Sequence, residues 1–350
     1  MMSTLKSGWY RLPGLLRYAL QRLAVGALLC VGVTFISFGL TQVVPGDPVA
    51  ANLGERAAAD PEIVALYRER YGLDRSLPEQ YGRYLFRLLQ GDLGESQQTH
   101  RPVAADLAQY MSATLELAIV AMILAMAAGV SLGLIAAVWR NRWPDQLIRV
   151  VSLAGVSVPT FWLALVCLYV FFFVLNLSPG VGRLGPGTPA PPVVTGLFTL
   201  DALLTGQWST LREALAYIAL PALVLATYTT GIVTRFTRAA MLDALGNEYV
   251  RAARAKGLPA HTVILRHALR PALAAIITVS GMAFGRMLAG AVLVESVYSW
   301  PGLGLYAYRS ALTLDLQAIM GVSLVIAVIY ILVNLAVDIL YAVIDPRIRY

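Results

Sequence analysis

Residues 115–138 decide the fold class of this protein, and they read LELAIVAMILAMAAGVSLGLIAAV. The stretch carries one charged residue, Glu116, near its start. A helix rises about 1.5 Å per residue, so about 20 apolar residues cross the roughly 30 Å hydrocarbon core of a bilayer. Because lipid offers no hydrogen-bond partners, a spanning segment must satisfy its own backbone, which a helix does. The stretch therefore predicts a transmembrane helix.

Five further stretches of the 350-residue chain have the same character. Apolar residues make up 58% of the chain and charged residues only 13%, with a mean hydropathy of +0.68. A soluble domain carries about 25% charged residues, so a soluble enzyme is excluded. The sequence predicts an all-α polytopic membrane protein with six transmembrane helices, in which Pro159 kinks the third. The other five predicted spans are 23–44, 147–174, 215–233, 273–294 and 319–341.

The positions of Lys and Arg predict the orientation of these helices. The net charge is +7, from 27 Lys and Arg against 20 Asp and Glu. Cations gather in the N-terminal segment 1–22, after the second span, in the loop 234–272 and in the tail 342–350. Cytoplasmic loops carry an excess of such residues, so both termini are expected in the cytoplasm. Residues 45–114 then form a periplasmic loop region, which precedes a five-helix core over 115–341.

Residues 234–272, here called the basic loop, are unusually long for a membrane connection. Their pattern predicts one helix over 237–256, followed by Gly257, a residue type common just past a helix end. Pro259 then suits the start of a second helix from Ala260. On composition, a solvated loop that only fixes the topology and a docking element for a partner are equally compatible with this pattern.

Several stretches together resemble the permeases of bacterial ABC importers of the peptide/nickel transport family. The basic loop carries EYVRAARAKGL at 248–258 and LRHALRP at 265–271, which resemble the coupling loop of that family, although Arg251 stands where the broader importer motif has Glu. Further similar stretches are VPGDP at 44–48, YGLD at 71–74, GDLGES at 91–96, ESVYSWPGLG at 295–304 and DPR at 345–347. The long first outer loop is similar to that of the first, or B-type, permease of such systems.

The resemblance implies a type I importer permease fold and half of a pore for dipeptides or oligopeptides in the bacterial inner membrane. Nickel, glutathione and oligosaccharides are rival substrates within the family. The implied partners are a second homologous permease, two cytoplasmic ATPases and a periplasmic or lipid-anchored binding protein, besides membrane lipids. Nucleic acid is not expected as a partner. The chain lacks a Gly-x4-Gly-Lys-Ser/Thr phosphate loop, so ATP and Mg²⁺ are expected on the ATPases, and this chain is expected to be neither an enzyme nor a metal or cofactor binder.

The resemblance also assigns residues. The expected coupling residues are Glu248, Tyr249, Ala252, Ala253, Arg254, Lys256, Gly257 and Leu258. The region expected to face the substrate's entry side, where the binding protein docks, contains Glu295, Trp300, Pro301 and Gly302.

Arg286 is the most informative charge inside a predicted span, because an ionisable residue there is costly unless it is paired or hydrated. Either it faces the translocation pathway and meets a substrate carboxylate or an acid of the partner subunit, or it pairs within the bundle. Glu116 and Asp338 lie near the ends of predicted spans and are given no transport role. An ion-coupled secondary transporter, the rival from another class, would have internal repeats and several intramembrane acids, a pattern this sequence does not show.

Overall fold

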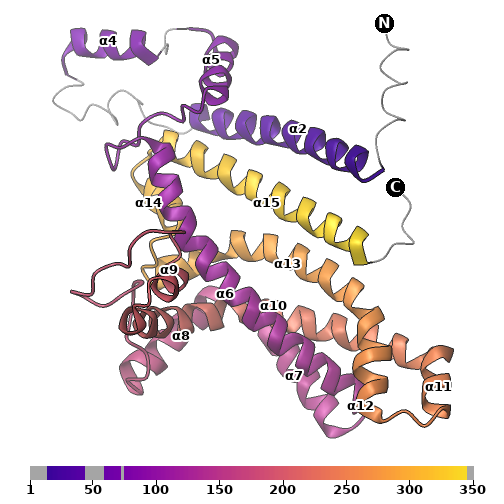
Figure 1. Ribbon diagram of the computed structural model, residues 1–350. Coiled ribbons are helices and arrows are strands. Elements are labelled where there is room, and N and C mark those ends of the chain that lie inside the picture. Colours follow the sequence, from indigo (N-terminus) through magenta and orange to yellow (C-terminus); the bar gives the residue numbers. More distant parts are fainter. Residues whose placement is uncertain (1–13, 44–58, 72–74, 345–350) are drawn as a thin grey trace, which may run out of the picture. The chain divides into compact units, whose positions relative to one another are not determined.

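The computed structural model describes residues 14–43, 59–71 and 75–344 (Figure 1). The predicted N-terminal segment lies mostly outside these residues, as do the motifs at 44–48 and 345–347 and most of the motif at 71–74. The all-α prediction is confirmed for the described part. The helices are α2 (Gly14–Val43), α4 (Pro61–Tyr71), α5 (Leu77–Leu89), α6 (Val103–Val138), α7 (Trp143–Ser157), α8 (Thr160–Leu168), η1 (Tyr169–Val174), α9 (Phe198–Leu204), α10 (Trp208–Gly246), α11 (Glu248–Ala255), α12 (Ala260–Thr262), η2 (Val263–Leu269), α13 (Arg270–Val297), α14 (Leu303–Leu312) and α15 (Leu316–Ile344).

Five described helices or helical runs have the length and apolar composition needed to cross a membrane. They contain α2, α6, α10, α13 and α15. α6 begins at Val103, inside the region expected to form the outer loop. A sixth span arises if α7 and the run α8–η1 together form one broken span.

The prediction of a kinked third helix is wrong, because the chain breaks there. α7 ends at Ser157, α8 begins at Thr160, and the two segments differ in direction by 100°. Val158 has an extended backbone with ψ 127°, the conformation that a following proline favours. Pro159 is extended as well, with ψ 130°, so two residues in succession leave the helical region. Two extended residues turn the chain, whereas a proline inside a continuous helix would only bend it.

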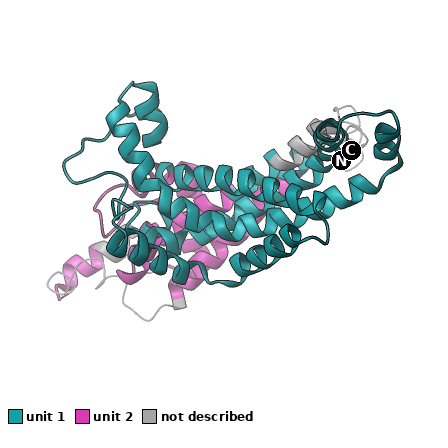
Figure 2. Cartoon of the chain, turned by 90° about the horizontal axis from the view of Figure 1, so that it is seen from below, with its two compact units in different colours: residues 1–23, 112–305, 330–350 teal, residues 24–111, 306–329 magenta. Residues whose placement is uncertain are grey.

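The chain divides into two compact units (Figure 2). Unit 1 comprises residues 1–23, 112–305 and 330–350, and unit 2 comprises residues 24–111 and 306–329. In unit 1, α10 packs on α13, α7, α9 and α8. Gly129 and Gly133, four residues apart on α6, allow α6 to approach Val233 and Thr237 of α10 closely. Small residues at such spacing are typical of membrane helix packing.

Unit 1 has two hydrophobic clusters. The first joins α6, α8, α10 and α13 around Leu117, Ile218, Met287 and Val294. The second joins the end of α10 to α11, η2 and the start of α13, around Met241, Val250, Val263 and Ile276. Figure 1 shows α11 and α12 at one end of unit 1 and α8 and α9 at the other. The second cluster therefore fixes the basic loop to the long helices.

In unit 2, α5 packs on α2 through aromatic side chains. The Tyr81 ring lies 5.5 Å from that of Phe35 and 5.4 Å from that of Phe38, and its hydroxyl donates to the Val31 carbonyl at 3.1 Å. Elsewhere in unit 2, the buried Asp315 accepts hydrogen bonds from Ser96 Oγ at 2.6 Å and from the N–H of Ala318 at 3.1 Å. Asp315 thus caps α15 and holds the segment before α6.

Candidate functional site: the basic loop and the buried charges

The helix α11 forms the core of the basic loop. Val250 and Ala253 point inward into the second cluster of unit 1. Of the expected coupling residues, only Ala253 is buried, and it packs in that cluster. The others are exposed. Together with Arg251, the exposed ones form the outer face of α11, a name that includes the residues just past its end: Glu248, Tyr249, Arg251, Ala252, Arg254, Lys256, Gly257 and Leu258.

The predicted helix over 237–256 is wrong in one respect, because it breaks at Asn247. Asn247 has an extended backbone with ψ 151°, and its side-chain amide donates to the Asp243 carbonyl at 3.0 Å. An asparagine side chain competes with the helix for backbone groups in this way. The break separates α11 from α10 and makes it a distinct short helix.

The end of α11 matches the prediction. The Gly257 N–H donates to the Arg254 carbonyl at 3.0 Å, and the Leu258 N–H donates to the Ala253 carbonyl at 3.4 Å. This pair of bonds is the Schellman arrangement, which needs a residue with positive φ. Gly257 has φ +74° and open space around it. Glycine is therefore required at position 257 because of the positive φ, and not because a side chain would collide with neighbouring atoms.

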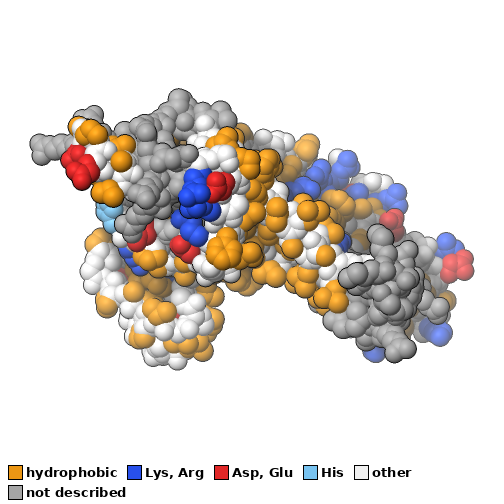
Figure 3. All heavy atoms as spheres, turned by 90° about the horizontal axis from the view of Figure 1, so that it is seen from above, with side chains coloured by type: hydrophobic (Ala, Val, Ile, Leu, Met, Phe, Trp, Pro, Cys, Tyr) orange, Lys and Arg blue, Asp and Glu red, His pale blue; other side chains and the backbone are white. Residues whose placement is uncertain are grey.

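The outer face of α11 is electropositive. Among the ion pairs of the described residues, none involves Arg251, Arg254 or Lys256. Hydrophobic side chains cover much of the surface in Figure 3, and Lys and Arg side chains are visible at the end of unit 1 that holds the basic loop as well as in a cluster elsewhere. Exposed Tyr249 and Leu258 lie among these cations. The face therefore combines positive charge with exposed apolar side chains.

Arg286 is exposed on α13. It shares one side of that helix with the exposed Met282, Ala289 and Leu293, at the spacing of successive helical turns. No side chain in the described part of the chain forms an ion pair with it. An ion pair of Arg286 within the bundle, one of the two interpretations, is therefore not formed among the described residues.

The motif at 295–304 is largely buried, and its polar groups are satisfied internally. Glu295 accepts hydrogen bonds from Thr114 Oγ1 at 2.6 Å and from the Leu305 N–H at 3.0 Å. The Trp300 indole donates to the Ala113 carbonyl at 2.9 Å. A side chain on Gly302 would collide with the Glu295 carboxylate. Of the expected docking residues, Glu295, Trp300 and Gly302 thus fix the turn before α14, and only Pro301 is partly exposed.

A second buried network contains Glu116, which lies inside α6 and not at a helix start. Arg183 donates to its carboxylate, and the Thr199 N–H and hydroxyl donate to it at 2.6 and 2.8 Å. The guanidinium also lies over the Phe198 ring, 3.5 Å from its centroid. Burial lowers the pKa of Arg183, and the charge of Glu116 opposes that shift. Sequence reasoning missed Arg183 because it lies in a loop far along the chain from its partner.

Two more carboxylates hold the same loop, residues 175–197. Glu213 accepts from the Gly185 N–H at 2.8 Å and from the Thr188 hydroxyl at 2.8 Å. Asp201 accepts from the N–H and hydroxyl of Thr195 at 2.7 and 2.6 Å. Burial alone would raise the pKa of Asp201, but these bonds and those from neighbouring N–H groups bring it below its ordinary value. The loop is therefore a rigid part of unit 1.

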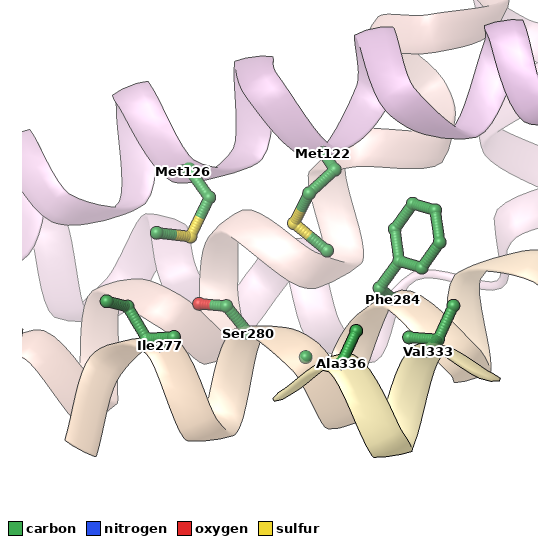
Figure 4. Close-up of a pocket in the computed structure, with 8 residues that line it drawn as sticks. Met122, Met126, Ile277, Ser280, Phe284, Val333 and Ala336 are labelled. Atoms are coloured by element: carbon green, nitrogen blue, oxygen red, sulfur yellow. The ribbon is translucent and has the colours of Figure 1, made fainter. Parts of the chain in front are cut away.

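An apolar cavity of about 310 Å³ lies between α6, α13 and α15 in unit 1 (Figure 4). Met122 and Met126 of α6 project into it, Met122 toward Phe284 and Met126 toward Ile277 and Ser280. Its one polar side chain, Ser280, donates to the Ile276 carbonyl at 2.7 Å. The cavity offers no charged group for a substrate terminus. Across the described residues, no group of three or more His, Cys, Asp and Glu side chains could hold a metal ion.

Comparison with known proteins relates this architecture to transport systems. Residues 129–350 match the family described as Binding-protein-dependent transport system inner membrane component, and residues 15–118 match its N-terminal counterpart. The probable D,D-dipeptide transport system permease protein DdpB of Escherichia coli K12 is 46% identical over 321 residues, covering 92% of this chain and 94% of the relative. The dipeptide transport system permease protein DppB of Alkalihalophilus pseudofirmus is 39% identical over 338 residues, covering 96% of this chain and all of the relative.

A solved structure supports the fold. The MetNI methionine ABC transporter in an inward-facing conformation matches with a TM-score of 0.50 at 14% identity, covering 68% of this chain and 96% of that chain. At this identity the match concerns the fold alone, and it agrees with the type I importer permease fold expected from the sequence. The chain belongs to the family of binding-protein-dependent transport system inner membrane components, the multi-pass permease subunits of ABC importers.

Proposed function

We propose that this protein forms half of the translocation pore of an ATP-driven importer of dipeptides or short oligopeptides. Its similar relatives, covered over nearly their whole length, are named as dipeptide permeases. The observation that carries the coupling part of the proposal is the outer face of α11, a positive and partly apolar surface fixed to the long helices by Val250 and Ala253. Such a surface suits a groove in a separate protein.

The partners follow from this arrangement. Two cytoplasmic ATPases bind ATP and Mg²⁺, and one of them receives α11. Because α11 shares a hydrophobic cluster with α10 and α13, a displacement of α11 moves these helices as a rigid body. The pore then alternates between inward-open and outward-open states, since ATP and the loaded binding protein bind the two states with different affinities.

The proposal places both termini and the basic loop in the cytoplasm of a bacterium, with the chain in the inner membrane. A second homologous permease completes the pore. A binding protein docks on the opposite side, near the motif at 295–304. Because most of that motif is buried, its residues contribute to docking indirectly, by fixing the conformation of the turn that contains the partly exposed Pro301.

Arg286 is proposed to face the pathway. Its exposure, together with the lack of an acid partner among the described residues, supports contact with a substrate carboxylate or with an acid of the second permease. A guanidinium left in the hydrocarbon core without such contact or hydration would be costly.

Uptake into vesicles tests the proposal. The complete complex, with its ATPases and binding protein, is reconstituted and supplied with labelled dipeptide, nickel, glutathione or an oligosaccharide. Dipeptide uptake that requires ATP supports the proposal, and uptake of only one of the other three would replace the peptide assignment. Uptake by this chain alone, driven by an ion gradient, would contradict the importer mechanism itself.

A further inference from the structure

A bidentate ion pair joins α7 to the end of α10 that leads into α11. Arg238 Nε donates to Asp145 Oδ1 at 2.7 Å, and a terminal guanidinium nitrogen of Arg238 donates to Asp145 Oδ2 at 2.7 Å. The Asn141 N–H donates to the same Oδ2 at 2.9 Å. The Asp145 side chain is 1% exposed and that of Arg238 is 21% exposed. Asp145 therefore connects the α6–α7 turn, the first turn of α7 and the last turns of α10.

The local backbone is built around this carboxylate. Asn141 has φ +62°, a conformation that a non-glycine residue rarely adopts, and its N–H points to Asp145. Trp143 and Pro144 then begin α7. A fork-shaped guanidinium pair adds directional specificity to the contact, which a simple point charge does not. The start of α7 is thus held in one orientation relative to α10.

The ion pair lies between the basic loop and the broken helix pair. α10 is one helix of 39 residues from Trp208 to Gly246, and α11 follows after Asn247. At its other end α7 stops at Ser157, where the chain turns by 100° into α8. Breaking a buried pair would leave an uncompensated charge, so the pair stays closed while the helices move.

From this geometry we infer that Asp145 and Arg238 are positioning residues that make α7 move with α10, and so carry the displacement of the basic loop to the α7–α8 break. The inference rests on the proposed function, because it concerns how ATPase movement reaches the pore. Neither residue is assigned to contact the substrate. The break at Val158 and Pro159 then acts as the hinge at which the motion of α7 reorients α8.

The test compares peptide taken up per ATP hydrolysed in reconstituted complexes. The variants are Asp145→Asn, Arg238→Gln and the double variant. The control is Asp243→Asn, which changes an exposed side chain at the same end of α10. Each single variant removes at least one charged hydrogen bond of this bidentate pair, so it is expected to lower the ratio about tenfold or more. The double variant should be no worse than either single one, since the two residues act as a unit.

Several outcomes separate this inference from a merely structural role. If uptake and hydrolysis fall together and the ratio stays at the wild-type value, the pair only stabilises the fold and the inference is wrong. It is also wrong if the two single effects add in the double variant. If the wild-type complex shows no ATP-dependent uptake, the proposed function fails and the inference fails with it.

A second measurement does not depend on transport by the variants. Spin labels at the exposed Val150 of α7 and Phe236 of α10 report the distance between these helices. In the wild-type complex the distance distribution should stay narrow and unchanged when ATP is trapped, and in Asp145→Asn it should broaden. A wild-type distribution that shifts on ATP trapping would overturn the inference, because α7 and α10 would then move separately.

Discussion

At the scale of single residues, buried and exposed charges have different surroundings. Glu116 and Asp145 are buried and saturated by hydrogen-bond donors. Arg286 is exposed on a membrane helix with no ion-pair partner among the described residues. A buried carboxylate that is fully paired supports the fold, whereas an accessible unpaired cation in a span is available for contact with a ligand or another subunit.

Replacement of Arg286 by alanine should abolish peptide uptake and leave complex assembly and ATP hydrolysis intact. The reason is that the side chain makes no ion pair within the described structure, so its removal should not destabilise the helix bundle. Uptake and hydrolysis by the reconstituted complex are the measurements, with Arg286→Lys as the control that keeps the charge. Full uptake by the alanine variant would remove Arg286 from the pathway.

Replacement of Gly257 by valine should uncouple ATP hydrolysis from uptake or prevent ATPase binding. A β-branched residue at φ +74° costs about 1–3 kcal/mol, so the end of α11 would rearrange. Gly246→Ala is the matched control, because this glycine has open space and no positive φ. If the valine variant binds the ATPases and transports like wild type, the coupling residues lie elsewhere.

Replacement of Glu116 by glutamine should destabilise the protein by about 3–5 kcal/mol, since it leaves the buried Arg183 without its counter-charge. Thermal unfolding in detergent measures this effect. The control is Glu79→Gln, which removes an exposed pair with Arg75 and should cost no more than about 1 kcal/mol. Equal effects of the two changes would contradict a structural role for the buried pair.

At the scale of helices, close packing of small residues organises unit 1. A methyl group added to Gly133 would lie 2.6 Å from Thr237 Cβ and 2.7 Å from the Thr234 carbonyl oxygen. Both contacts are shorter than atoms tolerate, so α6 and α10 can pack this closely only with glycine at that position. The α6–α10 contact therefore depends on a residue that has no side chain.

Gly133→Ala should therefore force α6 away from α10 and destabilise the protein by about 1–3 kcal/mol. Gly32→Ala in α2 is the control, because nothing lies within 4 Å of an added methyl group there. The midpoint of thermal unfolding distinguishes the two. An unchanged midpoint for Gly133→Ala would show that the helices accommodate the added methyl group by a small shift.

At the scale of the whole molecule, the protein is one subunit of a larger transport system. The family description and the exposed outer face of α11 both imply other chains. Affinity purification of this chain from mild detergent should therefore recover a second permease and ATPase subunits. The triple variant Arg251→Ala, Arg254→Ala and Lys256→Ala should lose the ATPases and retain the second permease. Loss of both partners, or of neither, would contradict docking of the ATPase at α11.

The sequence by itself determined the class of protein, the approximate spans and the end of α11 at Gly257. These features follow from local properties: apolar length, the positions of cations and the conformational freedom of glycine. The sequence also singled out Arg286, because a charge within an apolar run is visible without coordinates.

Only the tertiary structure decided the partners of residues far apart in the chain. Arg183 meets Glu116, Arg238 meets Asp145, and Thr114 meets Glu295 across separations that no local pattern reports. The tertiary structure also showed that the third span breaks at Val158 and Pro159 and that Asn247 separates α11 from α10. The physical reason is that a proline in an apolar run can either bend a continuous helix or end it, and an asparagine can either stay helical or bond to nearby backbone groups, so packing against other helices selects the outcome.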